Sequence, residues 1–127
     1  MQLINIIETF EREFSYSVVD IETGEEILKH SLRNLIGKPS RQCPVIKISY
    51  NPLSNPQFVF YIKKEETSPY KRTSLYEFIS LLNSDVKIYT DGENILHPDN
   101  LIKNIKICSD GALYINTKDA TTTIKKL

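Results

Sequence analysis

The amino-acid sequence predicts an α+β fold, a tandem pseudo-repeat of helix–hairpin–short helix–hairpin packed as one domain with a mainly antiparallel sheet. Two observations predict it. Apolar residues alternate between the helical period and the two-residue period of strands, in the same order twice along the chain. In addition, segments 19–36 and 86–102 match when Gly24 is set on Gly92, and both then carry the pattern G-E-x-I-L.

Length and composition predict how this fold is divided. A chain of 127 residues that is 40% hydrophobic and 25% charged is typical of one folded domain. We therefore expect a single domain over residues 1–127, with internal halves 1–63 and 74–116 joined by a polar linker at 64–73. Residues 117–127 are rich in Thr and Lys, which predicts an edge strand or a tail.

The first elements are predicted from local patterns. An opening helix of about three turns follows from one apolar stripe, formed by Leu3, Ile4, Ile7, Phe10 and Phe14. Residues 15–28 hold two short strand-like runs around Gly24, which predicts a β-hairpin. Ser31 is then predicted to cap a short helix at 32–36 that Gly37 ends.

The middle of the chain predicts two strands. In segment 45–50, Ile46, Ile48 and Tyr50 alternate with polar residues, so these three side chains are expected on the buried face. Residues 58–62 are apolar at every position. Such a run is typical of a central strand with both faces covered.

The second copy begins with a helix whose start is marked. Ser74 and Glu77 have the spacing of a capping box at the head of a helix over 75–83. The apolar residues of that segment again recur at helical spacing, which predicts one buried face.

Two hairpins and a short helix are predicted after it. Asp91 and Gly92 form a strong turn signal within a hairpin over 86–96. A short helix is expected at 98–104 because Pro98 is favoured in a first helical turn. A second hairpin is expected over 105–116, turning at Ser109-Asp110-Gly111.

The two histidines, His30 and His97, are the first residues to consider for chemistry. Each follows a copy of G-E-x-I-L, and each has a carboxylate nearby, Glu26 or Asp99. A pseudo-two-fold axis would bring the two rings to equivalent places, as in a shared metal site or an acid–base pair. The alternative is that each ring bonds local backbone at the entry to a short helix. We expect this alternative, and therefore no metal site and no cofactor.

Other catalytic patterns are not present in the sequence. Glu25 and Glu93 are repeated carboxylates beside the hairpin glycines, where charged side chains are ordinarily solvated. Cys43 and Cys108 lack metal-ligand spacing and are expected to be reduced thiols rather than a disulfide. The four glycines form no phosphate-binding loop. The sequence therefore predicts a protein that is not an enzyme, and an enzyme built on the two histidines is the third choice.

One stretch combines basic and aromatic residues and is the candidate partner-binding surface. A surface of this kind suits a partner protein, or a single strand of nucleic acid gripped through phosphates and stacking. Glu65 and Glu66 lie within it and favour a third interpretation, a solvated linker face. The candidate residues are Lys38, Arg41, Lys63, Lys64, Tyr70, Lys71 and Arg72.

Charge and size complete the functional expectation. Sixteen basic residues balance sixteen acidic ones, so no long-range attraction to nucleic acid or to an anionic membrane is expected. The longest apolar runs are far shorter than the roughly 20 residues that span a bilayer. We expect a cytoplasmic protein.

The function predicted from these observations is that of a small, non-enzymatic protein-interaction or regulatory module. Its size and its Ile-, Lys- and Asn-rich composition suit an accessory or inhibitor protein of a phage or mobile element that binds a host protein. The alternative is a nucleic-acid-binding module that uses the basic region from Lys63 to Arg72. Pairing of an edge strand with a second copy would give a homodimer.

Overall fold

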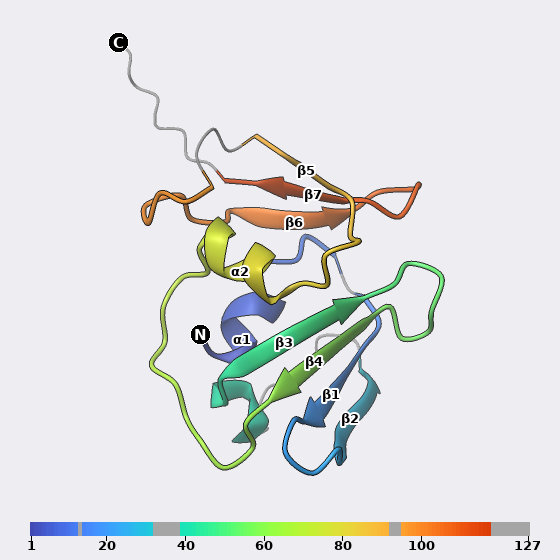
Figure 1. Ribbon diagram of the computed structural model, residues 1–127, viewed down its shortest axis with the longest axis vertical. Coiled ribbons are helices and arrows are strands. Elements are labelled where there is room, and N and C mark those ends of the chain that lie inside the picture. Colours follow the sequence, from blue (N-terminus) through green and yellow to red (C-terminus); the bar gives the residue numbers. More distant parts are fainter. Residues whose placement is uncertain (13, 32–38, 92–94, 118–127) are drawn as a thin grey trace.

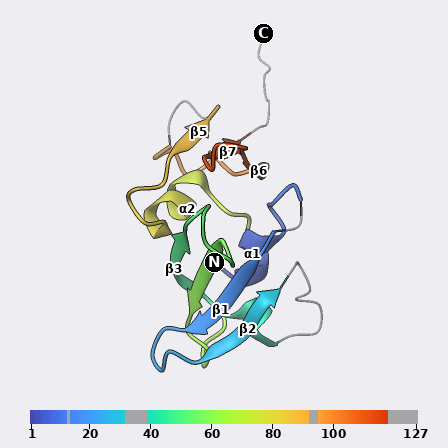
Figure 2. The same ribbon diagram turned by 90° about the vertical axis from the view of Figure 1, so that its right-hand side faces the viewer.

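Figure 1 shows the computed structural model of the protein, which describes residues 1–12, 14–31, 39–91 and 95–117. The described chain is a small α+β domain with two mixed sheets and short helices. One helix lies between the two sheets and another packs against the larger sheet (Figures 1 and 2). Within these residues, no helix has the length and apolarity needed to cross a membrane.

The larger sheet has the strand order β2-β1-β4-β3. Its strands are β1 (Tyr16–Asp20), β2 (Glu26–Ser31), β3 (Val45–Tyr50) and β4 (Phe58–Ile62). Strand β4 lies in the middle, parallel to β1 and antiparallel to β3, as the apolar run predicts. The hairpin of β1 and β2 is also confirmed, and Gly24 in its turn has a φ of +76°.

The smaller sheet has the strand order β5-β7-β6. Its strands are β5 (Ile88–Thr90), β6 (Asn104–Ile107) and β7 (Leu113–Asn116). The hairpin of β6 and β7 is confirmed, with Gly111 at a φ of +91° in its loop. Strand β5 runs parallel to β7, so this sheet is mixed as well.

The helices are short. They are α1 (Leu3–Ile7), the 3-10 turn η1 (Pro39–Gln42) and α2 (Leu75–Leu81). Ser74 is the N-cap of α2, and its hydroxyl accepts the N–H of Glu77 at 3.1 Å, so the predicted cap is confirmed. Glu77 also accepts a hydrogen bond from the Ser74 hydroxyl at 3.2 Å.

Helix α1 is shorter than predicted because the chain leaves it to pair with a distant strand. Phe10 forms a parallel bridge with Ile105 in β6. The N–H of Ile105 donates to Thr9 at 2.9 Å, and the N–H of Glu11 donates to Ile105 at 2.9 Å. Phe10 and Phe14 are buried, as the stripe predicts, but they are outside the helix.

Two predictions for the second copy are wrong within the described residues. No helix forms at 98–104: the chain makes turns, the N–H of Ile102 donates to Thr73 at 2.9 Å, and β6 begins at Asn104. Nor is there a hairpin over 86–96, because β5 pairs with β7 and Ile95 lies in a turn. Gly92 and Glu93 of that predicted hairpin lie outside the described residues.

Two further expectations fail in the first half. Ser31 ends strand β2 and pairs with Tyr16, so it is not a helix cap. Ile46 is 40% exposed because a bulge between Val45 and Lys47 turns it out of the buried face. The predicted helix at 32–36 and residues 118–127 of the predicted tail lie outside the described residues.

The two halves of the described chain share part of their element order, although β2 has no counterpart in the described part of the smaller sheet. In each, a helix precedes a strand that runs parallel to a middle strand, and a hairpin supplies the middle strand and the other edge. The N–H of Leu3 donates to Cys43 at 3.0 Å as α1 begins. At the start of α2, the N–H of Leu75 donates to Asn100 at 2.9 Å in the same way.

The halves also exchange their helix exits, meaning that the segment after each helix pairs with the sheet of the other half. Phe10, after α1, bridges Ile105 of the smaller sheet, whereas Leu82, after α2, bridges Ile48 of the larger sheet. This plan is helix–strand–hairpin rather than the predicted helix–hairpin–short helix–hairpin. This plan also differs from the alignment of Gly24 with Gly92. Tyr16 pairs with Phe58 of the middle strand β4, and Ile88 pairs with Leu113 of the middle strand β7, so the structure matches Tyr16 with Ile88.

A single core joins the halves, and its aromatic rings lie on the side of the larger sheet. Phe58 is fully buried, and its ring centroid lies 4.5 to 5.6 Å from those of four neighbours, Phe10, Phe14, Tyr50 and Phe60. The smaller sheet contributes aliphatic side chains to the same core, from Ile105, Leu113 and Ile115.

Candidate binding surface

Carboxylates pair with half of the six predicted basic residues. Each of the three predicted lysines that the structure describes forms an exposed ion pair: Lys63 with Glu66 (3.6 Å), Lys64 with Glu25 (2.8 Å) and Lys71 with Glu77 (3.1 Å). Exposed pairs of this kind contribute at most about 1 kcal/mol to stability. They do, however, cancel the charge on which the predicted patch depends.

The remaining predicted residues are spread over several elements. The hydroxyl of Tyr70 donates to Glu8 at 2.6 Å, close to α1, and Arg72 lines a shallow cavity with it. Arg41 is in η1, and Lys38 lies outside the described residues. Because Lys64 pairs with the β1–β2 turn and Lys71 pairs with α2, the set does not form one continuous basic surface.

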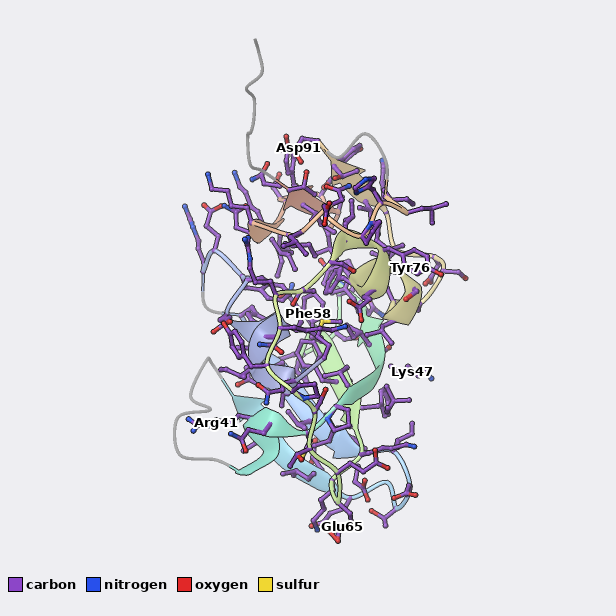
Figure 3. All side chains as sticks on the ribbon, turned by 90° about the vertical axis from the view of Figure 1, so that its left-hand side faces the viewer. Arg41, Lys47, Phe58, Glu65, Tyr76 and Asp91 are labelled. Atoms are coloured by element: carbon purple, nitrogen blue, oxygen red, sulfur yellow. The ribbon has the colours of Figure 1, made fainter. Side chains whose placement is uncertain are left out.

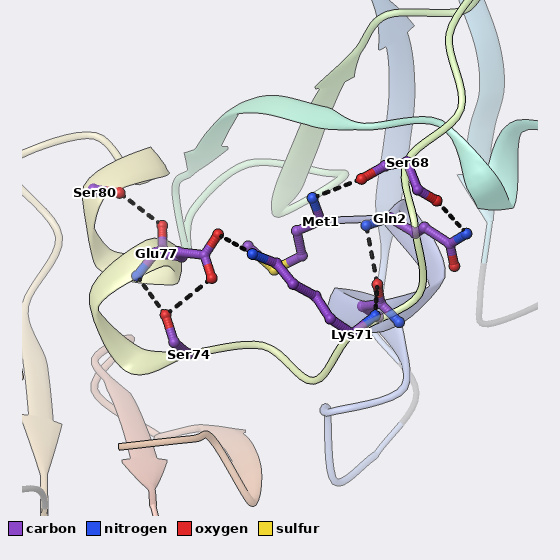
Figure 4. A network of polar contacts seen from close by, with 8 residues as sticks. Met1, Gln2, Ser68, Lys71, Ser74, Glu77 and Ser80 are labelled. Atoms are coloured by element: carbon purple, nitrogen blue, oxygen red, sulfur yellow. Dashed lines mark hydrogen bonds and ion pairs between the residues drawn. The ribbon is translucent and has the colours of Figure 1, made fainter. Parts of the chain in front are cut away.

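The predicted linker is bound along α1. The Met1 nitrogen donates to the Ser68 hydroxyl at 3.0 Å, and the side-chain amide of Gln2 donates to the Ser68 carbonyl at 2.6 Å (Figure 4). Farther along, the hydroxyl of Thr73 donates to the Asn5 carbonyl at 3.0 Å. Segment 64–73 is therefore held to the domain by specific contacts.

The candidate catalytic residues lie apart. His97 is exposed, and its Nδ1 accepts the N–H of Asp99 at 3.1 Å, which is the local backbone contact expected for it. His30 is in β2. Among the described residues, no three metal-ligating side chains gather at one place. Cys43 and Cys108 are free thiols, and burial raises the pKa of Cys43.

A surface that the sequence did not single out lies on the smaller sheet. Tyr89 of β5, Tyr114 of β7 and Lys106 of β6 are neighbours in one row across the three strands. Cross-strand neighbours share a face. The two tyrosines are 44% and 38% exposed, while Leu113 and Ile115, on either side of Tyr114, are fully buried on the other face.

Lys87 extends this row. Its ammonium lies 5.5 Å from the centroid of the Tyr89 ring, within the range of a cation–π contact. A hydrogen bond to Tyr89 raises the pKa of Lys87, and Asp110 adds to the effect. Two rings with a lysine at either end thus lie on one face of one sheet. We call Lys87, Tyr89, Lys106 and Tyr114 the tyrosine face.

The larger sheet shows what the fold itself requires at these positions. Its matching row is Ser17 of β1, Val59 of β4 and Ser49 of β3. Ser17 is buried, and the other two are half-buried. The same strand pairing therefore forms with small side chains, so the tyrosines and Lys106 are not needed to form the sheet.

The tyrosine face is also distant from part of the predicted surface. Figure 3 places Arg41 and Glu65 towards one end of the molecule and Asp91, which follows β5, at the other. A sequence signal for the face did exist, because Tyr89 and Tyr114 each alternate with apolar residues at strand period. What the sequence did not show is that these two strands are neighbours.

Comparisons with protein-family models, with curated proteins and with solved structures each found no match. The functional argument therefore rests on the residues of this chain.

Proposed function

We propose that this protein is a non-enzymatic binding module that contacts a partner protein through the tyrosine face. The supporting observation is that Tyr89 and Tyr114 lie exposed and adjacent on a sheet whose matching sheet has Ser17 and Val59 in their places. Tyrosine presents a large apolar area with a polar tip and loses little conformational entropy when a partner covers it. It is accordingly enriched at the energetic centres of interfaces.

On this proposal the module acts by covering a surface of its partner, as an accessory or inhibitor protein does. We also propose that its two halves derive from one duplicated helix–strand–hairpin unit. The matched hydrogen bonds of Leu3 and Leu75 and the reciprocal bridges of Phe10 and Leu82 support this origin. One copy then retained small residues on its outer row, and the other acquired the tyrosine face.

A second candidate function is binding of single-stranded nucleic acid through the same face. Lys87 and Lys106 flank the two tyrosines, and basic residues beside exposed rings can contact phosphates while bases stack. The sequence-based alternative placed this function at Lys63 to Arg72, where glutamates pair with the lysines. The tyrosine face is the better place for it.

The test is affinity capture of the tagged protein from extracts of the cells that encode it, with and without nuclease. The decisive variant is Tyr89→Ser/Tyr114→Val, which installs the residues of the matching row. We expect wild-type protein to retain a partner protein in a near-equimolar amount after nuclease treatment. The double variant should retain at least tenfold less of that partner. Capture that the double variant leaves unchanged would overturn the proposal.

Two controls make this result specific. Tyr76→Ala removes a tyrosine that is 49% exposed on α2 (Figure 3) and should retain the partner. The double variant should unfold in urea within about 1 kcal/mol of wild type, because surface substitutions away from packed groups have small effects. Binding of fluorescent oligothymidine that weakens steeply with salt and needs both tyrosines would instead establish the second candidate.

A further inference from the structure

A cavity of about 290 Å³ opens where the chain leaves α1 and pairs with β6. Its buried members, Phe10, Phe14 and Ile105, form an apolar floor. Its exposed members include two cations, Arg12 and Lys106. The full lining is Phe10, Glu11, Arg12, Phe14, Gln57, Ile105, Lys106 and Ile107. This volume is close to the lower limit of small-ligand sites.

The matching junction of the molecule, where the chain leaves α2 and pairs with β3, also has a cavity, of about 360 Å³, but its backbone groups are bonded differently. Asn83 follows Leu82 there, as Glu11 follows Phe10 at the cavity. The Asn83 side-chain oxygen accepts the N–H of Tyr50 at 2.8 Å, and its nitrogen donates to the Tyr50 carbonyl at 3.3 Å. One carboxamide therefore satisfies both backbone groups of Tyr50.

Ile107 takes the place of Tyr50 at the cavity. Tyr50 pairs with Phe58 in the larger sheet, and Ile107 pairs with Leu113 in the smaller one. The N–H of Leu113 donates to Lys87 at 3.0 Å, so the backbone groups of Ile107 point away from β7, towards the cavity. Glu11 has its side chain exposed, and in the described chain no side chain bonds Ile107 as Asn83 bonds Tyr50.

The charge at the cavity also differs from the matching junction. Arg12 stands where that junction has Ser84, and Lys106 stands where it has Ser49. Neither cation has a carboxylate within ion-pair distance among the described residues. The junction thus forms without these two cations. Glu11 also lines the cavity, so two cations and one carboxylate leave a net charge of +1, which favours a negatively charged ligand.

We infer that this cavity binds a peptide segment in which an apolar residue is flanked by acidic ones. A peptide amide of the ligand bonds the backbone groups of Ile107, as the Asn83 carboxamide bonds Tyr50. The apolar side chain covers the floor, and the acidic side chains pair with Arg12 and Lys106. The inference rests on the proposed function in taking the partner to be a protein, and Lys106 connects the cavity with the tyrosine face.

The test uses three synthetic peptides and the full ¹⁵N-labelled chain. The first probe is acetyl-Asp-Phe-Asp-amide; acetyl-Asn-Phe-Asn-amide removes the charge, and acetyl-Asp-Ala-Asp-amide removes the ring. We expect the first to shift the amide resonances of residues 10–12 and 105–107 in a saturable way. The other two should bind at least threefold more weakly.

Two variants then test the cations. Arg12→Ser and Lys106→Ser install the residues of the matching junction and should each weaken the first peptide at least threefold, with no change for the uncharged one. Lys47→Ser, an exposed lysine of the larger sheet, is the matched control and should change neither. The amide spectrum itself shows whether each variant is folded.

The possible failures are distinguishable. Equal affinity for the three peptides, no saturable shift, or shifts confined to other residues would overturn the cavity as a peptide site. Loss of partner capture in Tyr89→Ser/Tyr114→Val would still support the proposed function in that case. If peptide binding is confirmed and capture is insensitive to the tyrosines, the cavity stands and the tyrosine face fails.

Discussion

The two sheets share one pairing pattern and differ in where their aromatic residues lie. In the larger sheet, Phe58 and its neighbouring rings face inward, and the row through Val59 is made of small residues. Tyr61 is a half-buried ring on the same face as Val59, with the Lys47 ammonium 5.1 Å from its centroid. In the smaller sheet, Leu113 takes the place of Phe58, and Tyr89 and Tyr114 face outward. Strand pairing therefore does not decide which face carries the rings. Packing explains the inner rings, whereas Tyr89 and Tyr114 are 44% and 38% exposed on the face that we propose contacts a partner.

The largest effect that tests this contrast is expected in the aromatic core. Phe58→Ala should lower the free energy of unfolding by about 3–5 kcal/mol, because a fully buried ring in contact with four others is replaced by a cavity. Urea denaturation followed by circular dichroism measures this. Phe58→Leu installs the residue of the matching strand and should cost less. A loss below about 1 kcal/mol for Phe58→Ala would show that the ring cluster does not anchor the larger sheet.

An intermediate effect is expected at the two junctions where the segment after each helix pairs with the sheet of the other half. Asn83→Ala should cost about 1–3 kcal/mol, because both backbone groups of Tyr50 lose their partner. Glu11→Ala, at the matching position, should stay within about 0.5 kcal/mol of wild type. The same urea titrations compare the two variants. Equal costs would contradict the distinction between a junction whose strand backbone is bonded by a side chain and one whose strand backbone is not.

The smallest effect is pH-dependent and concerns the turn before β2, a strand without a counterpart in the described part of the smaller sheet. Asp20 accepts hydrogen bonds from the Thr23 hydroxyl at 2.8 Å and from the Lys64 N–H at 3.2 Å. The Thr23 hydroxyl, with backbone N–H groups, holds the pKa of Asp20 below its ordinary value. The stabilisation is therefore present above the ordinary carboxylate pKa and lost as pH falls through the lowered one.

Asp20→Asn tests this linkage. At pH 7 the variant should be less stable than wild type, and the difference should shrink as the pH falls below the ordinary carboxylate pKa and through the lowered pKa of Asp20. Urea midpoints measured across this range give the answer. Thr23→Ala should move the wild-type transition towards higher pH. A stability difference that is constant with pH would exclude the ionised carboxylate as its cause.

Elements with local signals were predictable from the sequence. The β6–β7 hairpin, the central strand Phe58–Ile62 and the Ser74 cap each depend on residues within a few positions of one another. Elements decided by distant partners were not. Phe10 continues the apolar stripe of α1, but the exposed edge of β6 takes its backbone out of the helix. Ile102 likewise enters an extended segment bonded to Thr73 rather than a helix.

The candidate site followed the same division. Lys64 and Lys71 were visible as a basic stretch, but Glu25 and Glu77, which pair with them, come from other elements. Tyr89 and Tyr114 lie in segments far apart in the chain, and only the parallel pairing of β5 with β7 makes them neighbours. The sequence shows the type of each side chain, but it does not show which side chains are neighbours in the fold.

The exchange of helix exits also determines when this protein can fold during its synthesis. The backbone groups of Thr9 and Glu11 bond Ile105, so residues 9–11 find their partner only after the chain has been synthesised as far as β6. A ribosome-bound chain that ends before β6 has the strands of the larger sheet without this contact, and the segment that Ile105 will meet stays open to solvent. Residues 9–11 therefore pack after the larger sheet has been synthesised, and contacts of such long sequence separation are slow to form.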